Sequence, residues 1–265
     1  MDPTSEQNVK QCCAAFYGSD LARLLLGESF HPGGTQLTER LGQLMQLTPD
    51  YKVLDVAAGR GTSAFYLAEA FGCEIFGIDL SKENVTAANE EATGRRVADR
   101  VSFRLADAER LPFDDGSFDA ILCECAFCTF PNKRRAAEEF ARVLKPGGRL
   151  GLSDLARSPA PLPELDGLLS WIACIADAQP VESYVETLRL ANISVSHVED
   201  HRQALIEMVR LVQGKLLGAE MMAGLKRLNL PNTDLSTAKR FAQAALTAVR
   251  NGNLGYAVIC GVKAC

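Results

Sequence analysis

The sequence lacks several features that membrane, secreted and nucleic-acid-binding proteins commonly have. No apolar run approaches the roughly 18 residues that a membrane span needs, and the first residues do not show the basic and apolar regions of a signal peptide. Acidic residues outnumber basic ones by 33 to 28, which disfavours binding along a phosphate backbone. The three histidines do not combine with the cysteines in a zinc-binding spacing. We expect a cytoplasmic protein that acts on a small molecule, without nucleic-acid or membrane partners.

Short apolar runs alternate with helical patterns along most of the chain. The pattern predicts seven strands, at residues 52–56, 74–79, 101–104, 120–123, 149–153, 193–198 and 255–262. Helices are expected around 63–71, 82–94, 134–143, 171–176 and 181–191, and from 201 to about 249 with a break near 229–232. This alternation is typical of a doubly wound α/β sheet with helices on both faces.

The same pattern divides the 265 residues into four parts. We expect an N-terminal helical lid at 1–48, a cofactor-binding core at 49–200, a helical insertion at 201–250 and the last strand of the core at 251–265. One large domain with an insertion is compatible with this length.

A glycine-rich turn follows the first expected strand. Residues 59–64 read G-x-G-x-x-A, and Asp79 ends the next strand about 20 residues further on. Glycines at this turn let the backbone approach a ligand closely, and a carboxylate at the second strand end can accept both ribose hydroxyls. A nicotinamide cofactor and S-adenosylmethionine would both satisfy the turn.

The wider pattern favours S-adenosylmethionine. Residues 53–62 resemble motif I of class I S-adenosylmethionine methyltransferases, and segments 105–113, 118–121 and 142–150 resemble later signatures of that superfamily. A cationic sulfonium also suits an acidic strand end better than a pyrophosphate does. The resemblance implies a seven-stranded Rossmann-like methyltransferase that contacts its cofactor through Asp55, Ala57, Gly59, Gly61, Thr62, Asp79, Leu80, Asp107, Ala108 and Glu124.

Cysteines gather where the fourth strand is expected to end. Segments 123–133 and 171–178 resemble arsenite methyltransferases, with Cys125 and Cys174 at cysteine positions of that family. The resemblance implies a trivalent arsenical, arsenite or methylarsenite, held by Cys174, Cys125 and Cys13, because arsenic(III) is soft and thiophilic. The thiols that would take part in catalysis are Cys174, Cys125, Cys128, Cys13 and Cys12, the last two from the lid.

Two other functions stay open. Residues 31–34, His-Pro-Gly-Gly, stand where the arsenite methyltransferases have a further cysteine, and their C-terminal domain is not recognisable. A methyltransferase of a small organic oxygen, nitrogen or carbon acceptor would need a base, for which His31, Tyr17 and Asp154 are candidates. A non-catalytic protein that binds or senses metalloids through its thiols is the second alternative. Cys73, Cys123 and Cys260 are expected in the core.

Overall fold

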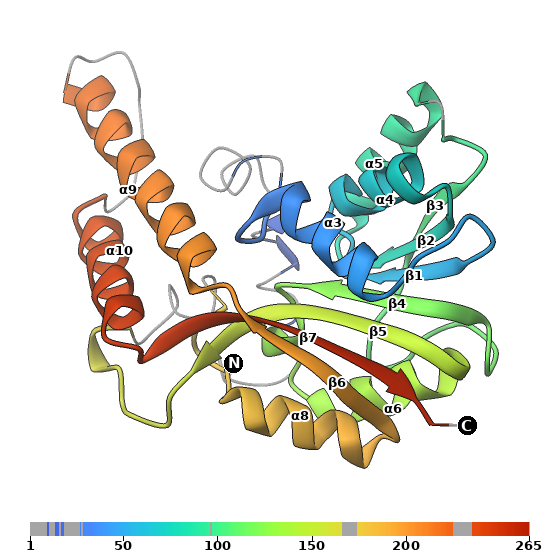
Figure 1. The fold of residues 1–265 in the computed structure, drawn as a ribbon. Helices are drawn as coiled ribbons and strands as arrows, with labels where there is room; N and C mark the ends of the chain where they lie inside the picture. The colour runs from blue at the N-terminus through green and yellow to red at the C-terminus, as the bar shows by residue number, and fades with distance from the viewer. Residues whose placement is uncertain are drawn as a thin grey trace.

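The computed structural model describes residues 10, 14–15, 17–18, 27, 29–95, 97–165, 174–224 and 235–264. Its centre is a seven-stranded sheet with the order β3-β2-β1-β4-β5-β7-β6 (Figure 1). β7 runs antiparallel to β5 and β6, and the other neighbouring strands are parallel. The strands are β1 (Lys52–Val56), β2 (Glu74–Asp79), β3 (Val101–Leu105), β4 (Phe118–Glu124), β5 (Leu144–Arg157), β6 (Ile193–Asp200) and β7 (Leu254–Lys263).

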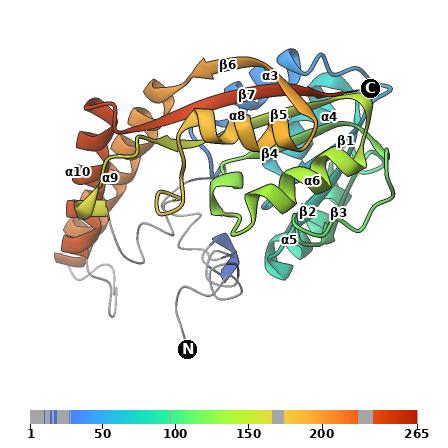
Figure 2. The same cartoon turned by 90° about the horizontal axis from the view of Figure 1, so that it is seen from below.

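Helices cover both faces of the sheet, as the doubly wound pattern predicts. Two groups of helices lie on opposite faces of the sheet (Figure 1), and the view from below has the second group in front (Figure 2). The first group is α3 (Gly34–Leu44), α4 (Thr62–Phe71) and α5 (Lys82–Gly94), and the second is α6 (Lys133–Val143) and α8 (Val181–Leu190). Two short 3₁₀ turns, Phe127–Thr129 and Pro163–Leu165, complete the connections.

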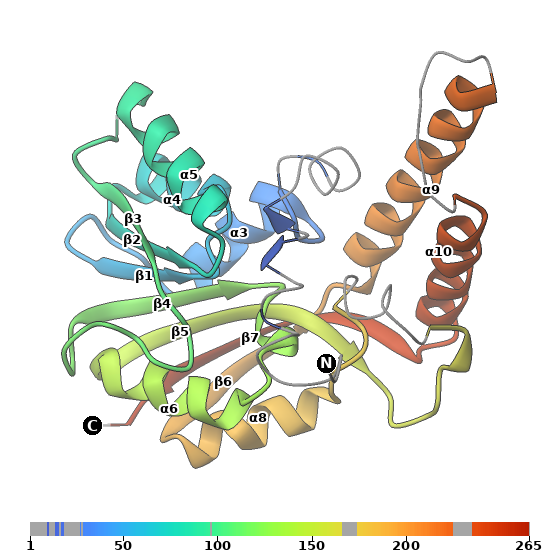
Figure 3. The same cartoon turned by 180° about the vertical axis from the view of Figure 1, so that it is seen from behind.

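Two long helices stand between β6 and β7. α9 (Arg202–Gly224) and α10 (Leu235–Arg250) pack side by side and project from one end of the sheet (Figures 1 and 3). Their place in the chain agrees with the helical insertion expected before the last strand. The expected break at 229–232 lies outside the described residues. None of the helices in the described part of the chain is long and apolar enough to cross a membrane.

The burial of the strands follows their position in the sheet. Four of the five residues of β1 are buried, because a central parallel strand is covered on both faces. β6 is an edge strand, and most of its residues alternate between partly exposed and fully exposed. Side-chain caps start two of the helices: the Ser81 hydroxyl accepts a hydrogen bond from Asn84 N, and Asn132 accepts one from Arg135 N.

The structure corrects one expected helix and extends five of the expected strands, β5 the most. The helix expected at 171–176 is wrong at its described end, because residues 174–178 are not helical and Cys174 has a φ of 61°. A left-handed backbone cannot continue a right-handed helix. β5 runs from 144 to 157 because its pairing with β7 continues to Arg157, and β4 begins two residues earlier than expected. Residues 166–173 and the apolar stretch at 21–26 lie outside the described chain.

Gly61 provides a test of the turn between β1 and α4. Its φ is 85°, and a Cβ there would overlap the Phe103 and Phe65 rings. Gly61→Ala should therefore lower the free energy of unfolding by about 2–4 kcal/mol, from left-handed strain and overpacking together. Chemical denaturation measures this. Gly94→Ala is the matched control, because that exposed glycine has no atom within 4 Å of the added Cβ; equal losses in both variants would contradict the steric argument.

Candidate functional site

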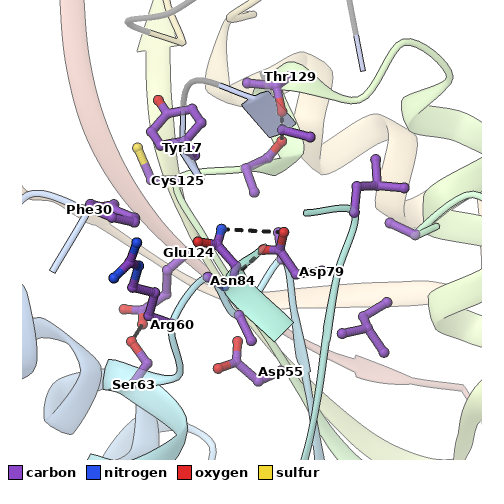
Figure 4. A pocket seen from close by; sticks show the side chains of 18 of the residues that line it. Tyr17, Phe30, Asp55, Arg60, Ser63, Asp79, Asn84, Glu124, Cys125 and Thr129 are labelled. Atoms are coloured by element: carbon purple, nitrogen blue, oxygen red, sulfur yellow. Dashed lines mark hydrogen bonds between the residues drawn. The ribbon is translucent and has the colours of Figure 1, made fainter. Parts of the chain in front are cut away.

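A pocket opens at the carboxyl ends of β1, β2 and β4. It holds about 1110 Å³ of empty space, part of it open to solvent, which is large enough for a small-molecule cofactor and a substrate. The structure brings together almost all of the residues expected to contact the cofactor. Lining the pocket are Asp55, Ala57, Gly59, Thr62, Asp79, Leu80, Asp107, Ala108 and Glu124 (Figure 4).

Gly61 is the one expected cofactor contact that does not line the pocket. Its backbone turns in the left-handed region and packs against Phe103, so it shapes the turn and does not face the cavity. The turn is held from the other side by Asp79, whose Oδ2 accepts a hydrogen bond of 2.9 Å from Gly59 N. Ala57 and Gly59 also have positive φ values, of 59° and 56°. The turn therefore keeps the backbone of residues 57–61 close to the cavity wall.

Carboxylates dominate the inner wall of the pocket. Asp55 is fully buried, and burial together with the nearby charges of Glu124 and Asp79 raises its pKa well above the usual range. Burial also raises the pKa of Asp79, although several backbone hydrogen bonds act against the rise. Burial disfavours the charged form of both carboxylates, and at Asp55 the neighbouring acids add to this effect, so a positively charged ligand would stabilise the ionised form.

Three buried polar atoms in this pocket have no hydrogen-bond partner. They are Ser29 Oγ, Asp55 Oδ2 and Asn84 Oδ1, and all three residues line the cavity. A buried polar atom without a partner destabilises a protein by about 1–3 kcal/mol, so such atoms in a cavity indicate where a ligand supplies the missing contacts. The ribose, amino and sulfonium groups of S-adenosylmethionine match this set of acceptors.

A second polar network surrounds Glu124. Its carboxylate accepts hydrogen bonds from Ser63 Oγ at 2.6 Å and from Thr38 Oγ1 at 3.1 Å. His31 Nε2 lies 3.4 Å from the same carboxylate, while Nδ1 lies 3.3 Å from the Pro32 carbonyl. Both imidazole nitrogens therefore have a polar neighbour at the edge of the pocket. Ser63 and Thr38 could not be found from the sequence, because hydroxyls in helices carry no distinctive signal.

The outer part of the pocket is aromatic. Tyr17 and Phe30 lie with their ring centres 5.9 Å apart, on the same side as Cys125, and Phe130 also lines the cavity (Figure 4). Lys10 lies at the rim of the pocket, where its ammonium pairs with Asp107 and Glu109 at 2.7 Å each. Phe30 was missed by the sequence analysis, although it directly precedes His31.

The thiols divide between the pocket and the space behind it. Cys125 lines the cavity, whereas Cys128 and Cys174 are buried and do not. The Cys174 sulfur lies 2.9 Å from the Tyr17 hydroxyl, and hydrogen bonds from Cys125, Cys128 and Tyr17 lower the Cys174 pKa well below its usual value. No three histidine, cysteine or acidic side chains among the described residues are arranged to hold a metal ion. Cys12 and Cys13 lie outside the described residues.

The remaining candidates separate into pocket residues and core residues. His31 and Tyr17, two of the three expected base candidates, line the pocket. Asp154 does not; it is buried and accepts a hydrogen bond from Cys128 N, and burial raises its pKa to about 7. Burial raises the pKa of Cys73 to about 11 and of Cys260 to about 12. Both lie in the core with Cys123, as expected.

Comparison with known sequences identifies the methyltransferase core. The profile of a family described as "Methyltransferase domain" matches residues 54–152. The chain is 36% identical over 155 residues to 27-O-demethylrifamycin SV methyltransferase of Amycolatopsis mediterranei, which covers 54% of this chain and 57% of that protein. It is 31% identical over 219 residues to O-methyltransferase cnsE of Penicillium expansum, which covers 82% and 78%. The chain thus spans about half the length of the first of these relatives.

Solved structures share the fold over nearly the whole chain. The [4+2]-cyclase SpnF superposes with a TM-score of 0.77 at 24% identity, which covers 98% of this chain and 97% of that one. Phosphoethanolamine N-methyltransferase 2 of Haemonchus contortus superposes with a TM-score of 0.76 at 17% identity, which covers 100% of this chain and 58% of that one. At such identities the likeness shows the architecture alone.

Fold and pocket together define a Rossmann-like methyltransferase architecture. The strand order, the turn at residues 57–61 and the acidic strand ends all stand within or beside the matched family segment. The chain belongs to the class I S-adenosylmethionine-dependent methyltransferases, and its cofactor is S-adenosylmethionine.

Asp55→Asn tests whether the buried carboxylate binds the cationic end of the cofactor. A folded-state pKa above the unfolded value means that Asp55 favours folding at acidic pH and opposes it progressively as pH rises. At neutral pH the variant should therefore unfold at a higher temperature than the parent when no ligand is added. Its affinity for S-adenosylhomocysteine should fall by roughly 10- to 150-fold, the loss of about 1.5–3 kcal/mol for a charged hydrogen bond.

Thermal unfolding with and without S-adenosylhomocysteine measures both effects, because a ligand of the native state raises the midpoint. Asp114→Asn is the control, since Asp114 is exposed and does not line the pocket. A ligand shift in Asp55→Asn as large as in the parent would remove Asp55 from the cofactor site.

Proposed function

We propose that this protein transfers the methyl group of S-adenosylmethionine to a small organic acceptor, at an oxygen, nitrogen or carbon atom. The observation that carries the proposal is the continuity of one cavity, from the acidic wall around Asp55 to the aromatic end around Phe30. A cofactor on the acidic side leaves the aromatic side for a second molecule. The names of the relatives, an O-methyltransferase and a demethylrifamycin methyltransferase, support an organic acceptor.

The inner residues would hold the cofactor. When bound, S-adenosylmethionine supplies an electrophilic methyl group on a positively charged sulfur. Asp79 is placed to accept the ribose hydroxyls and still hold the turn through Gly59 N. Asp55 and Asn84 offer unpaired oxygens to the cationic end, and Asp107 with Ala108 borders the space for the base. Each of these groups is fixed before binding, which reduces the entropy lost on ordering the site.

The outer residues would select the acceptor. Tyr17, Phe30 and Phe130 give that side an apolar, ring-lined wall. The ammonium of Lys10 is already paired with Asp107 and Glu109. Four carboxylates line the whole pocket, so a neutral organic molecule fits better than a strongly anionic one.

Proton removal from the acceptor would fall to His31 with Glu124. His31 lines the pocket, and its Nε2 lies 3.4 Å from the buried Glu124 carboxylate, which orients the imidazole. Tyr17 is a poorer base, because burial and the nearby Cys174 raise its pKa well above the usual value. Asp154 is separated from the cavity and bonded to backbone N–H groups of Cys128 and Leu155.

His31→Asn tests this role. Loss of a general base should lower kcat by roughly 10²- to 10⁴-fold, while cofactor binding stays close to that of the parent, because the acidic inner wall is intact. Steady-state methyl transfer and cofactor titration measure the two effects. His197→Asn, on β6 beside Glu199, is the matched control and should leave kcat unchanged. If His31→Asn had the same kcat as the parent, His31 would be excluded as the base.

A trivalent arsenical is the second candidate acceptor. The convergence of Cys125 on the cavity wall with Cys128 and Cys174 behind it favours this acceptor, because arsenic(III) binds thiolates strongly. Two points weigh against it. Cys128 and Cys174 do not face the cavity, and the relatives named above act on organic molecules.

A panel of acceptors separates the two candidates. Labelled methyl from S-adenosylmethionine should appear in one or more phenols, amines or carbon acids and not in arsenite, methylarsenite or selenite. Cys174→Ser should leave transfer to the organic acceptor within about threefold, since the thiol lies behind the pocket wall. Methylated arsenic as the sole product, lost in Cys174→Ser, would replace the organic proposal with the arsenical one.

A further inference from the structure

Transfer to an organic acceptor leaves a cluster of three thiols without a role. Cys125 and Cys128 follow β4, and Cys174 comes from the turn before α8. The Cys125 and Cys128 thiols each lie within hydrogen-bonding reach of the Cys174 sulfur. Cys123, only two residues before Cys125, is buried in the core and takes no part.

Cys174 has the surroundings of a thiolate. The Tyr17 hydroxyl lies 2.9 Å from its sulfur, and hydrogen bonding with the Cys125 and Cys128 thiols lowers the Cys174 pKa well below its usual value. The Tyr17 and Cys125 groups keep their own protons, because burial and the neighbouring sulfur raise their pKa values. A sulfur that receives several hydrogen bonds is stabilised as the anion, which is the reactive form of cysteine.

The backbone brings Cys125 and Cys174 together in an unusual way. Both have positive φ values, 52° and 61°, which side chains other than glycine seldom adopt. The Cys125 carbonyl oxygen lies 3.7 Å from the Cys174 sulfur, so the two segments are adjacent in main chain as well as side chain. Strained backbone of this kind persists where the surrounding structure fixes it, often at functional positions.

The pocket gives small molecules a way to this pair. Cys125 and Tyr17 both line the cavity, and Cys174 lies directly behind them. Cys174 is only 3% exposed, so a large reagent cannot reach it. Hydrogen peroxide is small enough to enter the pocket, where Tyr17 and Cys125 separate it from the Cys174 sulfur, so that a movement of these two side chains would admit it.

We propose that Cys174 is a peroxide-reactive cysteine that forms a reversible disulfide with Cys125 and so switches the pocket between two states. The Cys174 thiolate attacks one peroxide oxygen; an S–O bond forms, the O–O bond breaks, and the hydroxide that leaves takes up a proton. The Cys125 sulfur then loses its proton and attacks Cys174, forming the S–S bond and releasing the second oxygen as water. Two thiols are oxidised and one hydrogen peroxide is reduced to two waters.

The disulfide would change the pocket at its aromatic side. Cys125 is part of the pocket wall, and its sulfur would turn towards Cys174 on oxidation. Tyr17 would lose the free Cys174 sulfur that now lies 2.9 Å from its hydroxyl. Both changes fall where the acceptor is expected, so oxidation should weaken methyl transfer more than cofactor binding.

Mass spectrometry of the full chain tests the proposal independently of any activity. After treatment with hydrogen peroxide and blocking of free thiols, trypsin should release a disulfide that joins peptide 158–189, in which Cys174 is the only cysteine, to peptide 111–133. Cys128→Ser should retain this link, and Cys125→Ser should lose it. A thiol reductant should reverse it.

Two comparisons test whether Cys174 is the reactive thiol and whether peroxide reaches it through the pocket. Cys174→Ser should slow the loss of thiols at low peroxide by about tenfold or more, since thiolates react far faster than thiols, whereas Cys73→Ser should behave as the parent. Saturating S-adenosylhomocysteine should slow disulfide formation in the parent. The absence of the 111–133 to 158–189 link, its persistence in Cys125→Ser, or equal rates in Cys174→Ser and the parent would each overturn the proposal.

Discussion

Three carboxylates that the sheet holds close together determine which charge of ligand this site favours. Asp55, Asp79 and Glu124 stand on β1, β2 and β4, and β1 lies between the other two in the sheet. Parallel strands end at a common edge, so hydrogen-bond register fixes these side chains around one cavity. Burial and mutual repulsion raise the Asp55 pKa. The pocket therefore favours a positively charged ligand before any specific contact is considered, and a sulfonium cofactor satisfies that demand.

Much of this arrangement could be predicted from sequence, because it depends on local pattern. Mostly apolar runs of four to eight residues predicted the strands, and the spacing of Asp55, Gly59 and Asp79 predicted the turn and its partner. Gly61 shows the limit of such reasoning. The turn does need a glycine there, yet Gly61 lies against Phe103 and does not line the pocket, because a motif does not state which way a backbone turns.

Residues that depend on long-range contacts were less predictable. Glu124 was an expected cofactor contact, but its network with Thr38 and Ser63 forms because α3 and α4 bring these hydroxyls within hydrogen-bonding distance of its carboxylate. Cys174 was expected on a helix, because its apolar neighbours suggested one, whereas the contact with Cys125 and Tyr17 goes with a left-handed turn. In that turn tertiary contacts outweigh local preference.

The shared architecture does not by itself choose a reaction. A [4+2]-cyclase and methyltransferases of different acceptors have the same sheet, so the chemistry must be decided by residues outside it. In this chain Tyr17, Phe30 and His31 all precede α3, and Phe130 follows the short turn after β4. These segments form the half of the pocket that the family motifs do not describe.

Cys125 connects this variable half of the pocket to the thiols behind it. An arsenical acceptor would need several sulfurs open to the cofactor, but Tyr17 and Cys125 stand between the cavity and Cys174. A closed cluster with one reactive sulfur suits a reversible bond between neighbours better than coordination of a substrate. The cysteines that resemble a metalloid site are therefore placed to change the shape of the pocket wall. Because Tyr17 contacts Cys174, such a change would also reach a molecule bound against Tyr17.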